Sequence, residues 1–153
     1  MTVDLQAALP HLLPKAIAWA EIRAAETART GIPLIEPRLA IARSVGVTRP
    51  ELIRISMVPR LPQPEDAELL LVAQQTGLLG PNMAGLTLGH AIYICHGQDS
   101  IRLISHECRH VHQYEQAGSI AAFLPQYLRQ IATVGYANAP FEIDARAHEL
   151  LHV

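Results

Sequence analysis

The chain has little of what marks a nucleic-acid-binding protein or a small disulfide-stabilised one. Its formal net charge is −2 over 153 residues, and among its 12 Lys+Arg residues only Lys15 is a lysine. Aromatic residues make up 5% of the chain and are not interleaved with arginine, so we expect no nucleic-acid partner. The two cysteines, Cys95 and Cys108, form neither a CxxC pair nor a zinc knuckle. We expect Cys108 to be a small core residue, and a disulfide between the two stays open.

A long, uninterrupted hydrophobic run is also missing. Near the N-terminus, Pro10 and Pro14 break up the apolar residues and Lys15 follows, a pattern unsuited to a signal-peptide core or a membrane span. We therefore expect no membrane partner and, by default, a cytoplasmic protein. Export by a leaderless route is an alternative that leaves no signature in a sequence.

Apolar residues, by contrast, make up 50% of the chain. Because aromatics are few, aliphatic side chains and alanine must fill the core. A chain of 153 residues is long enough for one domain with a core of its own. We expect a single domain over residues 1–153, with an N-terminal helical segment at about 1–46 and a core at about 50–153. The oligomeric state is not predicted.

Local patterns predict helices that pack on a small sheet, an α+β fold. Proline, glycine and capping residues delimit the segments, and apolar residues recur at helical spacing. The expected helices span residues 16–30, 38–44, 65–75, 100–117 and 120–134, and one more begins at Pro140. The expected strands span 52–58 and 86–94, and the second of these is either one strand or a tight hairpin.

The most informative motif is HExxH, at residues 106–110. On a helix, side chains four residues apart lie on one face, so His106 and His110 can bind the same cation. Glu107, beside the first histidine, can reach a metal-bound water and serve as general base. The alternative is a helix that carries two solvated histidines and binds no metal.

The pattern around the motif favours a buried helix. Asp99 or Ser100 can cap its start, and Gly118 can end it. Apolar residues line one face, and the histidines lie on another, so we expect both faces to be buried. Buried histidines need polar partners, and a metal ion would supply one.

A third ligand separates the possible classes of zinc site. Metzincins have a third histidine six residues after the second, where this chain has Gln116, so that class is excluded. Gluzincins take a glutamate from a second helix. Pro140 predicts a helix start, and Glu142 falls in its first turn. Two histidines and one carboxylate leave the fourth tetrahedral position to water, as a catalytic zinc site requires.

The helix after Pro140 is expected to present two faces. One face is expected to pack in the core and consists of Ile143, Ala147, Leu150 and Leu151. The other is expected to turn towards the metal and consists of Glu142, Ala145 and Glu149. Asp144, His148 and His152 are expected on a solvated face. The alternative role for Glu142 is a helix-cap carboxylate or a partner of Arg146.

Other residues near the motif are candidates for supporting roles. Gln113 and His112 are candidates to contact the ligands from behind, because ligating histidines usually donate their other N–H. A tetrahedral oxyanion needs a donor besides the metal, and Tyr136 is the first candidate, with Tyr114 and His112 as weaker ones. The alternative for Tyr136 is a packed ring with its hydroxyl at the surface.

Three blocks of the sequence resemble the short gluzincin-like metallopeptidase domains, including those found in cargo of phage-tail-like contractile injection systems. The blocks are residues 87–93, which match an edge strand, 103–113, which match HExxHxxQ, and 136–145, a tyrosine before a proline-led glutamate helix. The resemblance implies a zincin-like minimal gluzincin core. It also implies one Zn²⁺ on His106, His110 and Glu142, with Glu107 as base.

The sequence therefore predicts a zinc metallopeptidase that cleaves a peptide or protein substrate. Cys108 and Arg109 are unusual at the variable positions of the motif, where apolar or small residues are commoner, and this bears on activity more than on metal binding. The first alternative is a catalytically silent, zinc-stabilised protein-binding module. The second is an accessory protein whose apolar N-terminal helix docks to a partner. For an enzyme of this size we expect a shallow groove covered by the N-terminal helix, and hence latent activity.

Overall fold

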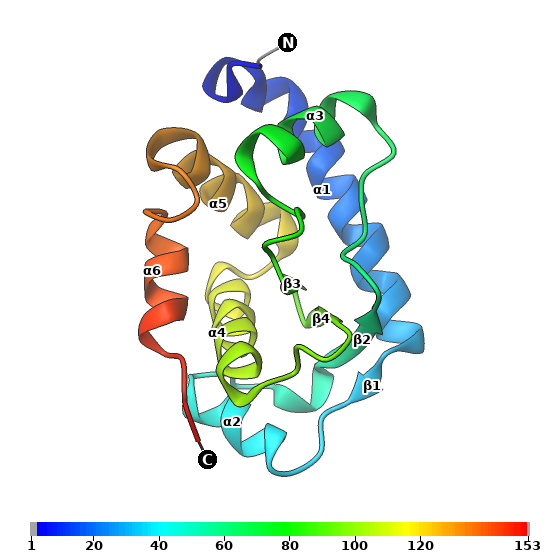
Figure 1. Ribbon diagram of the computed structural model, residues 1–153, viewed down its shortest axis with the longest axis vertical. Coiled ribbons are helices and arrows are strands. Elements are labelled where there is room, and N and C mark those ends of the chain that lie inside the picture. The colour runs from blue at the N-terminus through cyan, green and yellow to red at the C-terminus, as the bar shows by residue number, and fades with distance from the viewer. Residues whose placement is uncertain (1–2, 153) are drawn as a thin grey trace.

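The computed structural model describes residues 3–152 and has the α+β fold that the sequence predicts (Figure 1). Helices pack against a small mixed sheet. In chain order the described residues form α1 (Leu5–Thr30), β1 (Ile32–Pro33), α2 (Arg38–Ser44), a 3₁₀ turn (Pro50–Leu52), β2 (Arg54–Val58), α3 (Ala67–Thr76), β3 (Gly85–Leu88), β4 (Ala91–Cys95), α4 (Ile101–Ala117), α5 (Ile120–Val134) and α6 (Pro140–Ala147).

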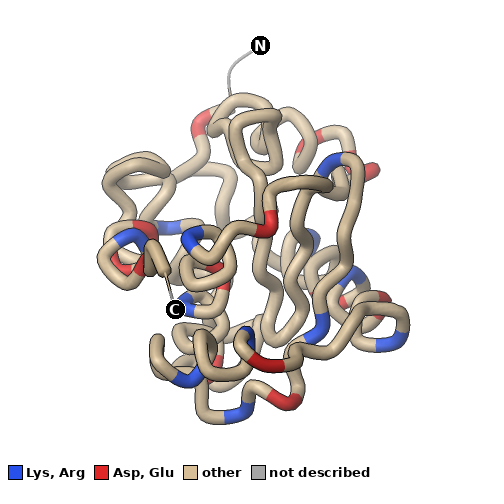
Figure 2. Tube along the Cα trace, turned by 60° about the horizontal axis from the view of Figure 1, so that its bottom comes forward, with Lys and Arg blue, Asp and Glu red and all other residues tan. Residues whose placement is uncertain are grey.

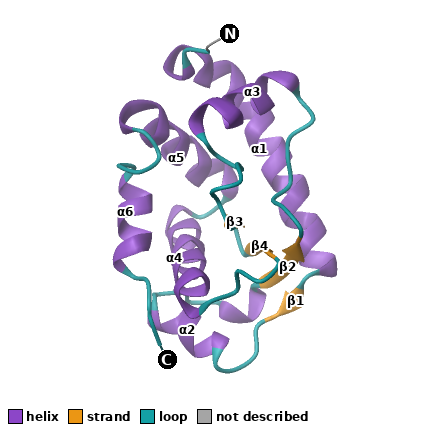
Figure 3. Cartoon of the chain, viewed as in Figure 1, coloured by secondary structure: helices purple, strands orange, loops and turns teal. Residues whose placement is uncertain are grey.

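The sheet has the strand order β1-β2-β4-β3, so β3 is an edge strand. Helices make up most of the molecule around the sheet (Figure 3). β2 and β4 are parallel, and β3 and β4 form an antiparallel hairpin that pairs Leu88 with Ala91. The expected segment 86–94 is therefore a hairpin with a two-residue turn. Gly89 in that turn has φ +69°, a conformation that glycine adopts without steric cost.

Each face of the sheet packs on different helices. Ile92 and Ile94 of β4 are fully buried against α2 and α4, whereas Tyr93 between them faces α1 and donates to the carbonyl of Arg23. This is the alternation that a strand buried on both faces requires. Cys108 lies in the core between the sheet and α4, and Cys95 packs against the core on the α1 side of the sheet. In the described part of the chain both are free, and burial raises the pKa of Cys108 to about 12.

Helix α1 begins eleven residues earlier than the sequence predicts, at Leu5 rather than residue 16. Pro10 and Pro14 lie inside it, and an interior proline costs about 3 kcal/mol in helix stability. Leu9 and Leu12 are buried, however, and burying one such side chain contributes about 1.5–3 kcal/mol. Tertiary packing of these leucines therefore offsets the local preference against a helix.

Helix α6 begins at Pro140 as expected, but its buried face differs from the predicted stripe. Ile143 is 50% exposed and Leu151 is 79% exposed. The helix ends at Ala147, so the helical spacing does not continue to Leu151. Ala145 is fully buried instead, and its small side chain allows α6 to lie close to α4.

Acidic and basic residues are interspersed along the chain, without a continuous basic segment (Figure 2). Many of the basic residues are paired, as in the contacts of Lys15 with Asp66 and of Arg38 with Asp99. None of the helices within residues 3–152 is both long and apolar enough to cross a membrane.

Candidate metal centre

His106 and His110 lie one turn apart on α4, with ring centroids 5.0 Å apart. The helix has the predicted ends: the Ser100 side chain accepts from the N–H of Leu103, and Gly118 terminates it with φ +100°. His106 is 8% exposed and His110 is 6% exposed. The alternative of two solvated histidines is therefore wrong, because this face of α4 is turned inwards.

Glu142, in the first turn of α6, completes the cluster and is 2% exposed. Its Oε1 lies 3.2 Å from Nε2 of His106, and its Oε2 lies 3.2 Å from Nε2 of His110. The candidate ligand atoms of all three residues lie within 4.8 Å of one another. Tetrahedral ligands of zinc, at about 2.0–2.2 Å from the ion, lie roughly 3.3–3.6 Å apart. The three residues could therefore hold one metal ion.

Opposite charges stabilise this cluster in the metal-free protein. Burial alone would raise the pKa of Glu142, but hydrogen bonds from His106 and His110 outweigh burial and hold that pKa far below its usual range. Burial alone would likewise lower the pKa of His110, yet the hydrogen bond and charge of Glu142 raise it to about 9. The pKa of His106 is also raised, against burial, by Glu142 and Glu107. A metal that binds here must therefore displace protons at neutral pH.

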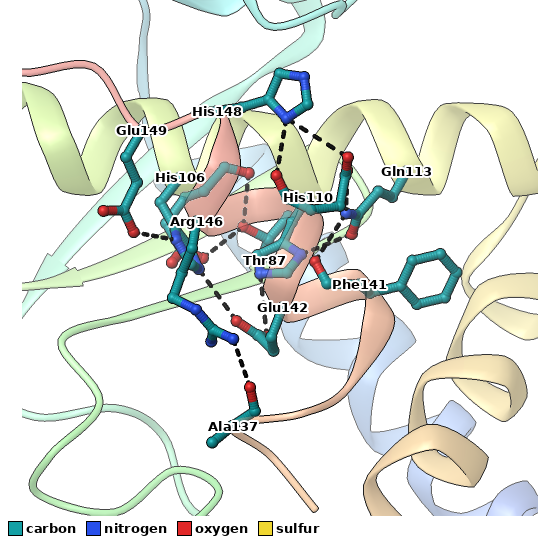
Figure 4. A network of polar contacts seen from close by, with 12 residues as sticks. Thr87, His106, His110, Gln113, Ala137, Phe141, Glu142, Arg146, His148 and Glu149 are labelled. Carbon is teal, nitrogen blue, oxygen red and sulfur yellow. Dashed lines mark hydrogen bonds and ion pairs between the residues drawn. The ribbon is translucent and has the colours of Figure 1, made fainter. Parts of the chain in front are cut away.

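The outer ring nitrogen of each histidine has its own partner (Figure 4). His106 Nδ1 lies 2.8 Å from Oε2 of Glu149, and His110 Nδ1 lies 2.8 Å from Oε1 of Gln113. A neutral imidazole that donates its Nδ1–H in this way presents the lone pair of Nε2 to a metal. Gln113 thus lies behind the ligands, where the sequence predicts it, whereas Glu149, predicted to face the metal, instead contacts the outer nitrogen of His106.

Arg109, inside the motif, links α4 to two other segments. Its Nε and Nη2 donate to Oδ2 and Oδ1 of Asp144 at 2.8 and 3.2 Å, and its Nη1 donates to the Val45 carbonyl at 2.8 Å. Gln113 Nε2 donates to Asp144 Oδ2 at 2.9 Å and to the Phe141 carbonyl at 3.0 Å. Asp144, expected on a solvated face, instead accepts hydrogen bonds from α4, because Arg109 and Gln113 reach it across the contact between the two helices.

The structure does not bring His112 to the metal site. Its Nδ1 lies 3.0 Å from the carbonyl oxygen of Gly46, to which it donates. Gly46 has φ +104°, and a Cβ there would lie 2.8 Å from His112 Nδ1 and 3.1 Å from Arg109 Nη1. His112 therefore holds the turn at Gly46 against α4 and is not a partner of the ligands, which corrects the role expected from its position in the motif.

Two tyrosines approach Glu142, and only one of them is expected from the sequence. Tyr127 of α5, which the sequence analysis misses, donates to Oε2 of Glu142 at 2.8 Å. The signal was available, because Tyr127 stands one turn after Phe123 on an apolar face, where a buried hydroxyl needs a partner. Tyr136 lines the same cavity as Glu142 and His110. Burial and the charge of Glu142 raise the pKa of both tyrosines, so both hydroxyls keep their protons at neutral pH.

Glu107 faces the edge strand β3 and is itself buried. Thr87 Oγ1 lies 2.8 Å from Oε1 of Glu107 and 3.1 Å from its main-chain carbonyl. Gly85 is required beside it, since a Cβ at that position would lie 3.0 Å from Glu107 Oε2. The side chain also lines the cavity that His110 and Glu142 line. Thr87 was expected only as part of a strand, because its contact with Glu107 joins residues twenty apart in the chain.

Comparisons with protein-family models, with curated proteins and with solved structures found no match for this chain.

Replacing Arg109 with leucine is expected to weaken metal binding, measured with Zn²⁺, by up to about 10-fold, the low end of the loss when a direct partner of a ligand is removed, because Arg109 acts on the ligands through Asp144 and Gln113. The change deletes the ion pair that sets α6, and with it Glu142, against α4. Competition titration against a chromogenic chelator measures the affinity. Arg102→Leu, at an exposed position of the same helix, is the matched control and should bind zinc like the wild type. Equal affinities in the two variants would contradict the positioning role of Arg109.

Stability should depend on pH differently with and without metal. In the metal-free protein the raised pKa of His110 contributes stability that is complete below about pH 6.5 and lost as pH rises through about 9. The lowered pKa of Glu142 contributes stability above its ordinary value of 4.5 that is lost at lower pH. We therefore expect the cluster to stabilise the metal-free protein most between about pH 5 and 6.5. Melting temperatures measured with EDTA should fall towards pH 9, and those measured in saturating zinc should not. A parallel dependence of the melting temperature on pH in the two conditions would contradict the prediction.

Proposed function

We propose that the protein is a zinc-dependent metallopeptidase, with His106, His110 and Glu142 as zinc ligands and Glu107 as general base. The observation that carries the proposal is the meeting of three buried donors from two helices, with a second carboxylate, Glu107, lining the same cavity as His110 and Glu142. Two imidazole nitrogens and one carboxylate oxygen are a ligand set typical of catalytic zinc. When bound, Zn²⁺ would lower the pKa of a coordinated water and polarise the scissile carbonyl.

The surroundings of Glu107 suit a proton carrier. Thr87 donates to Oε1, which leaves Oε2, next to Gly85, to accept a proton from the attacking water. The same oxygen can then pass the proton to the leaving amine. Because the hydrogen bond from Thr87 and the close approach of Gly85 restrict the carboxylate, little reorganisation is needed for the transfer.

The two tyrosines divide into distinct roles. The Tyr127 hydroxyl already donates to Glu142, so it positions a ligand. Tyr136 lines the cavity beside Glu107 and keeps its proton, since burial and the charge of Glu142 raise its pKa. We assign to Tyr136 the hydrogen bond to the oxyanion that develops on the attacked carbonyl.

The edge strand offers a place for an extended peptide. Cys95 donates to the carbonyl of Ala84, so hydrogen-bonded and non-hydrogen-bonded pairs alternate along the hairpin from that point. In this alternation the backbone N–H and C=O groups of Gly85 and Thr87 point to the free edge. These two residues also contact Glu107. A peptide that pairs with β3 would therefore pass beside the general base.

The zinc-stabilised protein-binding module remains the second candidate. The contact of Glu142 with both histidines of α4 favours it, because an ion at this place would join α4 to α6 whether or not a substrate is cut. It predicts bound zinc and a large loss of thermal stability on chelation, with no peptide hydrolysis.

Glu107→Gln is expected to keep zinc but to lower the rate of peptide hydrolysis about 10²- to 10⁴-fold, because the water loses its proton acceptor. Digestion of a peptide library, read by mass spectrometry, measures the rate, and metal analysis measures the zinc. Glu21→Gln, at an exposed position of α1, is the control and should digest like the wild type. Unchanged turnover in Glu107→Gln would end the assignment of the base. Zinc-loaded wild type that cuts nothing would favour the binding module.

A second experiment distinguishes the proposed roles of Tyr127 and Tyr136. Tyr136→Phe is expected to lower kcat about 10²- to 10³-fold while zinc affinity stays unchanged, as when an oxyanion donor is removed. Tyr127→Phe is expected to weaken zinc binding, because Glu142 loses a hydrogen bond. Steady-state kinetics on a cleaved peptide and zinc titration of both variants test this. The opposite pattern, with zinc loss in Tyr136→Phe only, would reverse the two roles.

A further inference from the structure

A cavity extends from the candidate metal centre to apolar residues of the N-terminal half of the chain. Its volume is roughly 140 Å³, and α1, α3, α5 and β3 contribute to its walls. The sequence predicts a shallow groove beneath the N-terminal helix. The structure has a partly open cavity for which α1 forms one wall, because the buried leucines of α1 pack beside α3 and α5.

The two ends of this cavity differ in chemistry. The end near the metal site carries Glu107, His110, Tyr136 and Glu142. Away from that end the described lining consists almost entirely of carbon-rich side chains. Representative members are Leu9, Trp19, Val72, Met83 and Leu128. A charged or strongly polar group placed at that end would lose its hydration without gaining a partner, which is unfavourable.

The volume limits the occupant to one side chain. A dry cavity of about 150 Å³ lined by leucine, isoleucine and phenylalanine holds one benzene molecule. The cavity here has a similar volume and a largely apolar wall, so it has room for one phenylalanine, leucine or methionine side chain. This volume favours one side chain over a long acyl chain or two side chains at once.

We propose that this cavity is the specificity pocket of the enzyme and takes one large apolar side chain of the peptide, from a residue next to the bond that is cut. The inference rests on the proposed peptidase function, because it needs the reacting carbonyl at the polar end. Half of the residues that line the pocket, and most of its apolar ones, lie before Gly85, outside the segment that resembles metallopeptidase domains. The first half of the chain thereby contributes to the choice of the substrate on which the second half acts.

The first experiment tests the pocket without any metal. Binding of 4-fluorotoluene, which has the shape of a phenylalanine side chain, is followed by ¹⁹F NMR in the presence of EDTA. Ala16 lines the cavity, whereas Ala18, on the same helix, is exposed. Binding to the wild type and to Ala18→Phe, with binding at least about tenfold weaker in Ala16→Phe, supports the pocket. No binding to the wild type, or equal binding to both variants, overturns it.

The second experiment needs no variant, so it stands even where Ala16→Phe does not fold. Calorimetry on the zinc-loaded wild type compares N-acetyl amino-acid hydroxamates that differ only in the side chain. Leucine and phenylalanine hydroxamates are expected to bind at least about tenfold more tightly than those of glycine and aspartate. Affinities within twofold of one another, or tightest binding by a dodecanoyl hydroxamate, overturn the proposal.

The two proposals can fail separately. Hydroxamates report on the pocket without turnover, so a graded series together with no peptide cleavage would keep the pocket and remove the peptidase. Cleavage that depends on Glu107 but shows no preference for a large apolar residue beside the cut bond would keep the peptidase and remove the specificity pocket.

Discussion

The buried carboxylate of Glu142 is the group on which the arrangement of the second half of the chain depends. Removing a carboxylate from water costs several kcal/mol, and only good hydrogen bonds or a metal can offset that cost. Here His106 and His110 approach from α4 and Tyr127 donates from α5. Glu142 thus joins three helices at one point. A metal ion at this point would replace protons with a stronger bond to the same atoms.

The positions of these donors depend in turn on contacts one layer further out. Gln113 accepts from His110 and donates to Asp144, and Asp144 accepts from Arg109, which also reaches the carbonyl of Val45. This chain of bonds sets the distance between α4 and α6. It also explains why arginine can occupy a place in the motif that usually holds a small or apolar residue: its guanidinium group points away from the metal and into the contact between helices.

The two halves of the chain contribute different properties to the site. Residues from α4 and α6 supply the metal donors, and β3 orients Glu107 through Thr87. The long helix α1 and the shorter α3 supply apolar walls but no metal donor. The proposed chemistry and the proposed selectivity can therefore vary independently: a substitution such as Ala16→Phe changes the pocket without touching a ligand.

The sequence by itself determined the features that depend on neighbouring residues. Histidines four apart, the cap at Ser100, the stop at Gly118 and the helix start at Pro140 all follow from local geometry, and the three predicted ligands lie together. Only the tertiary structure decided which distant groups meet. It brought Tyr127 into hydrogen-bonding distance of Glu142, Asp144 of Arg109 and His112 of Gly46. It also kept α1 helical through Pro10 and Pro14. The physical reason is that burial and hydrogen bonding between remote segments involve energies as large as local preferences, and no short window of sequence contains both partners.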